Sequence, residues 1–314
     1  MEGAIRIVLS ADAGFRPQLA VALKSIARNG GGARFELFVL HDGFDGPLRE
    51  QFESVLDGVG RVEWLDARSP ATAEALLPDY LPAASLFRLR MEDLLPDYID
   101  RVLYLDADVI VRRPLEELWM AELGESLAAA VRDPIVPWAG APMGLPWREV
   151  GVAASAPYFN SGVLVIPLDR WRSEHVGRRG LELLARRRLR HGDQCALNVL
   201  MEGRWAALDP SWNLQGGHLY ENSLALVTES LDILHASRSN PAIVHFNHSA
   251  WGRPWQPGCT HPFRQEWIEL LDATPWAGGR PDERGRSQPG TTASLARRAY
   301  WRLARGARVL IKGF

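Results

Sequence analysis

Two aspartates about one third of the way along the chain have the residue type and the spacing of a metal site. Asp106 and Asp108 lie in residues 101–114, between strongly apolar residues that favour a β-strand. Side chains alternate across a strand, so two residues that are one apart point to the same face and can share one cation. Burying both without a positive partner would be costly, and such oxygen ligands favour Mg²⁺ or Mn²⁺ held jointly with a phosphorylated substrate. The alternative is that the two aspartates start a turn or cap the next helix.

The elements that must position these aspartates alternate along the first half of the chain. Strands are expected at 5–9, 35–40, 62–65, 102–105, 162–166 and 242–246, and helices at 17–27, 47–56, 84–95, 175–189 and 195–201. This alternation predicts an α/β fold with a mainly parallel central sheet and helices on both faces. Ligands of such sheets bind beyond the carboxyl ends of the strands. Asp12, Asp42 and Asp106 each follow such an end, which is where a nucleotide is expected.

Composition narrows the class of protein. The chain has 314 residues, with 36 basic against 38 acidic side chains, so bulk nucleic-acid binding is not expected. Cys195 and Cys259 have neither metal-site spacing nor a disulfide framework, which fits a reducing cytosol. The first residues lead into a predicted strand rather than a signal peptide, and no apolar run is long enough to span a bilayer. A cytoplasmic location is therefore expected.

The distribution of apolar residues, and of the Gly and Pro residues that interrupt helices and strands, divides the chain into three regions. Residues 1–276 are expected to form the catalytic α/β domain, and residues 277–292 have the Gly, Pro and polar content of a flexible linker. Residues 293–314 alternate arginines with apolar side chains, as in a basic amphipathic helix. This tail predicts peripheral contact with the inner face of the cell membrane. A helix packed on its own domain or on a partner subunit is the alternative.

A segment without clear periodicity lies between the predicted strands of the two halves. Residues 132–159 are rich in Pro, Gly, Ala and Trp, and could form a lid over a site or a surface loop. Trp138 and Trp147 could stack on a sugar, but loop tryptophans more often anchor the loop to the core. The anchoring interpretation is preferred.

Further polar residues stand at strand ends and helix starts in the second half. Asn160 opens the apolar strand, Asp193 and Gln194 begin a helix, His245 ends the late strand, and Arg253 follows shortly after it. Each has a simpler interpretation alone. His245 would be a hydrogen-bonded core histidine, Asp193 a helix N-cap, and Asn160 a partner of loop backbone.

Together with the segment 209–213 and the Asp-x-Asp pair, these motifs resemble glycosyltransferase family 8. This is a retaining group that includes bacterial lipopolysaccharide galactosyl- and glucosyltransferases and glycogenin. The resemblance runs from residue 5 to about residue 271 and depends on the order and spacing of all the motifs. It implies a GT-A fold, a nucleotide diphosphate sugar donor that is usually a uridine one, and Mn²⁺ bridging protein and diphosphate, with Mg²⁺ as a second possibility.

The resemblance also implies the roles of particular residues. It assigns the metal to Asp106, Asp108 and His245, a set of oxygen and nitrogen ligands that suits Mn²⁺ better than Ca²⁺. It places Asp12 at the uracil of the donor, and Arg88 and Asp106 in contact with the donor. Around the transferred sugar it places Asn160, Asp193 and Gln194. Arg253 stands where the family has a lysine on the diphosphate. Pairing with Glu92, one helical turn later, is the simpler interpretation of Arg88.

A mechanism follows from the charges of such a site. Cleavage of the bond to the diphosphate leaves negative charge on phosphate and positive charge on the sugar ring. The cation and Arg253 would stabilise the first. Gln194 can offer its amide oxygen to the second, but a neutral amide is a poor nucleophile. Front-face displacement, in which the departing phosphate takes the proton of the acceptor, is therefore favoured over a covalent intermediate on Asp193, and retention is the expectation from the family.

Departures from the family pattern affect the donor site. Where the family commonly has Asp-Glu-Asn-Tyr, this chain has Asp-Ala-Gly-Phe at 12–15, so the asparagine side chain and the tyrosine hydroxyl are missing. Cys195 replaces the second aspartate of Asp-Gln-Asp, and residues 247–252 are inserted before Arg253. These differences bear on base preference and sugar identity rather than on the reaction class.

Other classes of protein fit less well. A haloacid-dehalogenase phosphohydrolase needs a lysine downstream of its aspartates, and the chain has none between Asp108 and Lys312. A nucleotidyltransferase usually has a basic Gly-rich loop after the first strand, where this chain offers only Arg16. The remaining alternative is a non-catalytic nucleotide-sugar-binding protein, with Gly14 and Cys195 as marks of lost activity. The expected partners are UDP-galactose or UDP-glucose and a glycan, lipid-linked or small-molecule acceptor.

Overall fold

The structure is a computed structural model that describes residues 3–68, 77, 81–220, 225–247 and 251–279. Of the predicted linker, only residues 277–279 fall within this part of the chain, and the whole predicted tail, 293–314, lies outside the described residues. Within the ranges described, no helix combines the length and the apolar character needed to cross a membrane.

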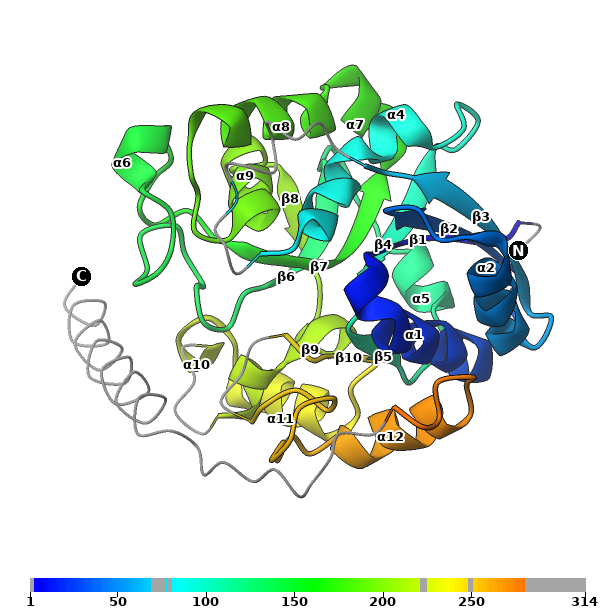
Figure 1. Cartoon of the computed structure of the whole chain (residues 1–314). Helices are drawn as coiled ribbons and strands as arrows, with labels where there is room; N and C mark the ends of the chain where they lie inside the picture. Colours follow the sequence, from blue (N-terminus) through cyan, green and yellow to red (C-terminus); the bar gives the residue numbers. More distant parts are fainter. Residues whose placement is uncertain (1–2, 69–76, 78–80, 221–224, 248–250, 280–314) are drawn as a thin grey trace.

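The core of the protein is a seven-stranded sheet with the strand order β3-β2-β1-β4-β7-β6-β8 (Figure 1). The strands are β1 (Ile5–Ala11), β2 (Phe35–His41), β3 (Gly60–Asp66), β4 (Arg101–Asp106), β6 (Ala128–Arg132), β7 (Phe159–Pro167) and β8 (Trp205–Ala207). All neighbours are parallel except β7, which runs antiparallel to both β4 and β6. The predicted α/β fold with a mainly parallel sheet is therefore confirmed. Because β7 is reversed, its first residues lie at the edge where the parallel strands end.

Helices cover both faces of this sheet. The α-helices in the described part of the chain are α1 (Arg16–Asn29), α2 (Gly46–Glu53), α4 (Met91–Leu94), α5 (Glu116–Trp119), α6 (Trp147–Val150), α7 (Leu168–Ser173), α8 (Val176–Arg186), α9 (Gly192–Leu200), α10 (Ala225–Thr228), α11 (Leu231–Ser239) and α12 (Arg264–Asp272). Tyr104 of β4 lies in one core cluster with Trp171 of α7 and Leu197 of α9, whereas its neighbour Leu105 lies in a second cluster with Leu23 of α1. Figure 1 shows α7, α8 and α9 on one side of the sheet and α1 and α2 on the other.

The predicted helix at 84–95 has a different form in the structure. Most of it is the 3₁₀ helix η3 (Ala83–Arg90), and only the last turn, α4, is α-helical. Leu95 then adopts an extended conformation, as expected of a residue that precedes proline.

A second, three-stranded sheet with the order β5-β10-β9 is formed by β5 (Val109–Val111), β10 (Ile243–His245) and β9 (Leu214–Gln215). The prediction that Asp106 and Asp108 share one strand is wrong. β4 ends at Asp106, and Asp108 lies in the turn that carries the chain from the large sheet into the small one. Because β10 pairs antiparallel with β5, with His245 opposite Val109, the imidazole is brought beside this turn.

The irregular segment at 132–159 is anchored by its two tryptophans. Trp138 and Trp147 are partly buried and pack against the core cluster that includes Tyr104. Trp138 also forms an isolated β-bridge with Pro157. The anchoring interpretation of these side chains is thus confirmed.

Stability should depend on pH through the buried histidine His218 of the 3₁₀ helix η5 (Gly216–Leu219). Its imidazole is 1% exposed and its Nδ1 accepts the backbone N–H of Gln215 at 3.0 Å. Burial, and then the charge of Arg238, lowers its pKa to about 3. Between this value and about 6.5 the unfolded state binds more protons than the folded state, so stability falls as the pH falls.

We therefore expect the free energy of unfolding to drop, through His218 alone, by up to about 1.4 kcal/mol per pH unit below pH 6.5. His218→Asn keeps an acceptor near the Nδ1 position but does not titrate, so its unfolding curves at pH 7 and pH 5 should differ less than those of the wild type. Equal pH dependence in both proteins would show that His218 binds a proton without unfolding.

Candidate metal centre and active site

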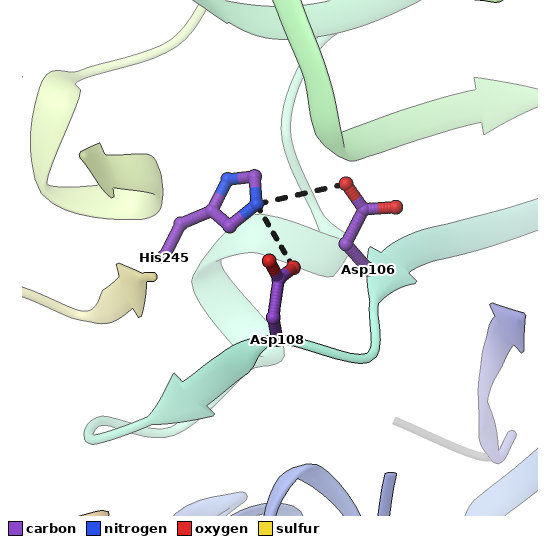
Figure 2. Close-up of side chains that lie close together, drawn as sticks. All are labelled: Asp106, Asp108 and His245. Carbon is purple, nitrogen blue, oxygen red and sulfur yellow. Dashed lines mark ion pairs between the residues drawn. The ribbon is translucent and has the colours of Figure 1, made fainter. Parts of the chain in front are cut away.

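Three side chains that could hold a metal ion, two from one turn and one from a strand much later in the chain, meet at the carboxyl edge of the large sheet. Nε2 of His245 lies 3.1 Å from Oδ1 of Asp108 and 3.6 Å from Oδ2 of Asp106, as Figure 2 shows. One ligand atom from each residue lies within 4.8 Å of the other two. Two carboxylates and an imidazole form a mixed oxygen and nitrogen set that suits Mn²⁺.

The electrostatics of this group favour a positive charge between the side chains. Burial lowers the pKa of His245, but Asp108 and Asp106 outweigh burial, so the pKa is raised. Burial raises the pKa of Asp108, but His245 and Arg253 outweigh it, so that pKa is lowered. A divalent cation supplies the positive charge that the two carboxylates otherwise draw onto the imidazole, and the three side chains therefore fit such an ion.

Space for the imidazole is provided by Gly162 of β7. A Cβ atom added at this glycine would lie 2.8 Å from Oδ2 of Asp106 and closer still to the ring of His245. Gly162 was not among the site residues predicted from the sequence. A lone glycine inside a fully buried strand often marks the close approach of another group, and this signal could have identified it.

The outer nitrogen of the imidazole is held by Asn213. Nδ1 of His245 lies 3.0 Å from Oδ1 of Asn213, a fully buried residue at the end of the 3₁₀ helix η4 (Pro210–Asn213). An amide oxygen can only accept a hydrogen bond, so Nδ1 carries a hydrogen and donates it to Asn213, and Nε2 is the nitrogen left to bind a metal ion beside the aspartates. Asn213 belongs to a segment of the family resemblance, but it was not among the predicted site residues.

Arg88 joins the candidate metal ligands to the predicted sugar site. Its Nη2 donates to Oδ1 of Asp106 at 2.7 Å, its Nε forms an ion pair with Oδ2 of Asp193 at 2.8 Å, and its Nη1 donates to the carbonyl of Ser161 at 2.5 Å. The guanidinium also lies over the ring of Tyr104, 4.4 Å from its centroid. Since Oδ1 of Asp106 is thus occupied, Oδ2 is the oxygen that faces His245.

The simpler interpretations of Arg88 and Asp193 are both wrong. The carboxylate of Glu92 does not pair with Arg88 but accepts backbone N–H groups of Gly177 and Arg178 at the start of α8. Asp193 is not an N-cap, because α9 begins at Gly192 and Asp193 is its second residue. Burial raises the pKa of Asp193 to about 6; the charge of Arg88 opposes this shift, and Asp106 adds to it.

Replacing Arg88 should destabilise the protein strongly. Its side chain is 6% exposed and that of Asp193 is 5% exposed, so Arg88→Met leaves a buried carboxylate without its cation. Loss of one partner of a buried ion pair costs about 3–5 kcal/mol. Arg88→Lys keeps the charge and should lose less. Urea unfolding of both variants tests this, and a loss below about 1 kcal/mol in Arg88→Met would contradict the buried pairing.

The side chains of Asn160 and Gln194 form a polar network at the start of β7. Oε1 of Gln194 accepts hydrogen bonds from Nδ2 of Asn160 at 2.9 Å and from the backbone N–H of Ser161 at 3.2 Å. Nε2 of Gln194 lies 3.3 Å from the hydroxyl of Tyr158 and 3.4 Å from Oδ2 of Asp133. Asp133, which is 6% exposed, was not predicted, because it lies in the irregular segment without a pattern around it.

Cys195 contributes a neutral group where the family has an aspartate. Its Sγ lies 3.2 Å from the hydroxyl of Tyr158. Burial raises the pKa of the Cys195 thiol to about 11, so it stays protonated at neutral pH. The departure therefore removes a negative charge from this part of the site but keeps a hydrogen-bond partner.

Asp12 lies apart from this cluster, just beyond the carboxyl end of β1. Its Oδ1 accepts the backbone N–H of Gly14 at 2.8 Å, and Asp42, after β2, accepts that of Ala13 at 3.4 Å. In β1, Ser10 is the register partner of Asp106 in β4, so Asp12 follows on the same edge of the sheet. The predicted strand-end aspartates thus share the edge where nucleotides bind in such folds.

Arg253 lies in a loop that meets the same region. Its guanidinium carbon is 5.8 Å from the ring centroid of Trp255, and the ring of Trp255 packs edge-on against that of Phe15 at 6.1 Å. Its Nε is buried and makes no hydrogen bond within the part of the chain described. Its charge acts on Asp108, so it can serve an anionic group beside the metal ligands.

Comparison with known proteins gives one consistent result. Residues 6–257 match the family model "Glycosyl transferase family 8". The chain is 26% identical to general stress protein A of Bacillus subtilis, over 87% of this chain and 94% of that protein. It is also 26% identical to the lipopolysaccharide 1,3-galactosyltransferase of Salmonella typhimurium, over 62% of this chain but only 56% of that protein. The structure resembles that of the galactosyltransferase LgtC in complex with donor and acceptor sugar analogues, with a TM-score of 0.73, 26% identity, and coverage of 88% of this chain and all of LgtC.

Proposed function

The chain belongs to glycosyltransferase family 8, and we propose that it is a metal-dependent, retaining hexosyltransferase. It would move galactose or glucose from a uridine diphosphate sugar to a glycan, lipid-linked or small-molecule acceptor. The observation that carries the proposal is the meeting of Asp106, Asp108 and His245 at the carboxyl edge of the sheet. Likeness to lipopolysaccharide galactosyltransferase and to LgtC supports the choice of hexose.

Three side chains would hold the ion in this enzyme. Asp106 and Asp108 supply oxygen ligands and His245 supplies Nε2, a set for which Mn²⁺ is the better candidate and Mg²⁺ the second. When bound, the ion acts as a Lewis acid that stabilises negative charge on the diphosphate leaving group.

Arg253 would add a second positive charge at the diphosphate. Its Nε makes no hydrogen bond to the described residues, and its charge acts on Asp108 beside the candidate metal ligands. An arginine fork can hold phosphate at two points, whereas the lysine of the family holds it as a point charge. The charge is thus conserved and the geometry of the contact differs.

The residues around Arg88 would bind the transferred sugar. Asp193 is kept in place by the guanidinium and can accept hydrogen bonds from sugar hydroxyls. Because this ion pair withdraws charge from the carboxylate, Asp193 is a poor candidate for a covalent nucleophile. Gln194 holds its amide oxygen at the same edge, and a neutral amide does not attack. Front-face displacement, with the acceptor proton passing to the departing phosphate, is the step that these groups support.

The nucleotide base would lie at Asp12, on the same edge of the sheet. Gly14 and Phe15 offer no polar side chain there, so contacts to the base and ribose are fewer than the family pattern provides. The predicted membrane contact through residues 293–314 and the cytoplasmic location remain predictions.

Incubation of the full chain with Mn²⁺ and either UDP-galactose or UDP-glucose tests the proposal. Without an acceptor, slow release of free sugar and UDP is expected from the true donor, and thermal unfolding should shift upward with that donor. EDTA should abolish both effects. Binding of UDP without release of sugar from any donor would instead favour the non-catalytic nucleotide-sugar-binding protein.

A further inference from the structure

We propose that Asn213 is a positioning residue that couples the metal-binding imidazole to the amide of Gln194 through Asn160. The proposal rests on the proposed function, since it assigns roles to the groups around the same ion and sugar. The hydrogen bonds run in one direction from the imidazole, which serves metal binding, to the amide of Gln194, which serves turnover.

The first link fixes the imidazole. Nδ1 of His245 donates to Oδ1 of Asn213 at 3.0 Å, and the two side chains are 3% and 0% exposed. This hydrogen bond keeps Nε2 on the side of Asp106 and Asp108, where its lone pair can bind a metal ion that lies between the three side chains.

The next two links run from Asn213 to the sugar site. Nδ2 of Asn213 donates to Oδ1 of Asn160 at 2.9 Å, and Nδ2 of Asn160 donates to Oε1 of Gln194 at 2.9 Å. All three amides, Asn213, Asn160 and Gln194, therefore accept on the side of the metal centre, and each donates on the side away from it.

Backbone N–H groups and a carboxylate fix the direction of these hydrogen bonds, so that donors and acceptors cannot be exchanged along the series. The N–H of Gly162 donates to Oδ1 of Asn160 at 3.0 Å, so this atom must be the oxygen. Oδ2 of Asp133, an acceptor only, lies 3.4 Å from Nε2 of Gln194 and 3.4 Å from Nδ2 of Asn160. The N–H of Ser161 meets Oε1 of Gln194. The orientation of each amide is thus set by groups that cannot exchange donor for acceptor.

Asn213 consequently has two functions that can be separated by mutation. Its oxygen orients the imidazole and so serves metal binding. Its nitrogen holds Asn160 and, through it, keeps the amide oxygen of Gln194 in place, and so serves turnover. Asn213→Asp keeps the first and removes the second, whereas Asn213→Ala removes both.

The test measures Mn²⁺ binding to the full-length protein by calorimetry, separately from kcat and KM for the donor. Asn213→Ala should bind Mn²⁺ about 10- to 100-fold more weakly than the wild type. Asn213→Asp should bind it within about threefold of the wild type or more tightly, because a carboxylate also accepts from the imidazole. Its kcat should nevertheless fall about 10- to 100-fold with little change in donor KM, since the amide of Gln194 is misplaced.

Two further variants keep the test decisive. Asn160→Asp still accepts from Asn213 but cannot donate to Gln194, so it should reproduce the low kcat and normal Mn²⁺ affinity if Asn213→Asp does not fold. Asn198→Asp is the control for lost stability. The buried amide of Asn198 forms hydrogen bonds with the backbone of Phe159 and with the carbonyl of Gln194, and it takes no part in the hydrogen bonds from His245 to the Gln194 amide. Its Mn²⁺ affinity should not change.

Wild-type Mn²⁺ affinity in Asn213→Ala, or wild-type kcat in Asn213→Asp or Asn160→Asp, would overturn the inference while leaving the proposed function intact. Absence of Mn²⁺ binding by the wild-type protein would refute the metal centre itself, and the coupling with it.

Discussion

Asp106→Asn should abolish Mn²⁺-dependent donor binding and lower kcat/KM by about 10³-fold or more. The carboxylate serves three neighbours at once, since Oδ1 accepts from Arg88 and Tyr104 and Oδ2 faces His245. Asparagine has nearly the same shape but no charge, and its NH₂ group would face either the guanidinium or the ion. Both the metal centre and the pairing of Arg88 are weakened by one change.

Calorimetric titration of Mn²⁺ in the presence of UDP, together with initial rates of sugar release, measures this loss. Asp100→Asn is a matched control, because Asp100 immediately precedes β4, its side chain is 75% exposed and it pairs with Arg6. This variant should keep wild-type binding and turnover. Normal transfer by Asp106→Asn would mean that the ion is held elsewhere.

Gly162→Ala should damage the site as severely, although it adds only a methyl group. The new Cβ would lie 2.8 Å from Oδ2 of Asp106 and would overlap the ring of His245. β7 is buried along its whole length and is hydrogen-bonded to β4 and β6, so its backbone cannot retreat. The imidazole must move instead, and the three ligand atoms no longer converge.

For Gly162→Ala we expect Mn²⁺ affinity to fall at least about 100-fold and turnover to fall with it, with a loss of stability of about 1–3 kcal/mol from overpacking. Gly46→Ala, at the start of α2 with nothing within 4 Å of the added Cβ, should behave as the wild type. The same Mn²⁺ titration and urea unfolding decide the matter. Unchanged Mn²⁺ affinity in Gly162→Ala would contradict the placement of His245 against β7.

Part of the site could be predicted because it depends on patterns among residues that are close together in the sequence. Apolar strands followed by Asp12, Asp42 and Asp106 show where the chain leaves the sheet, and parallel strands must then present these ends at one edge. The order of the later motifs added Asn160 and His245 through a family resemblance rather than through any local signal. The fold and the family were therefore within reach of the sequence.

Other parts were not predictable, because they depend on which strand pairs with which. Alternation along one strand placed Asp106 and Asp108 on one face, but the chain turns between them into a second sheet. Arg88 has a carboxylate one turn away in Glu92, yet its partners are Asp106 and Asp193. Local spacing suggests Glu92 as the partner of Arg88. Only the packing of η3 against α8 and α9 brings the guanidinium to its actual partners.

The sequence by itself indicated β1, β2, β3, β4, β7 and β10 and the edge at which the parallel strands end, because alternation, burial and turn formation act between near neighbours. It did not indicate the strands β5, β6, β8 and β9. Only the tertiary structure decided how the site residues meet. The antiparallel pairing of β10 with β5 brings His245 to Asp108, and the reversed direction of β7 brings Asn160 and Gly162 to the same edge. The orientation of Asn213 toward His245 depends on both. Such contacts join residues far apart in the chain, and their geometry is set by the packing of the whole core rather than by any short segment.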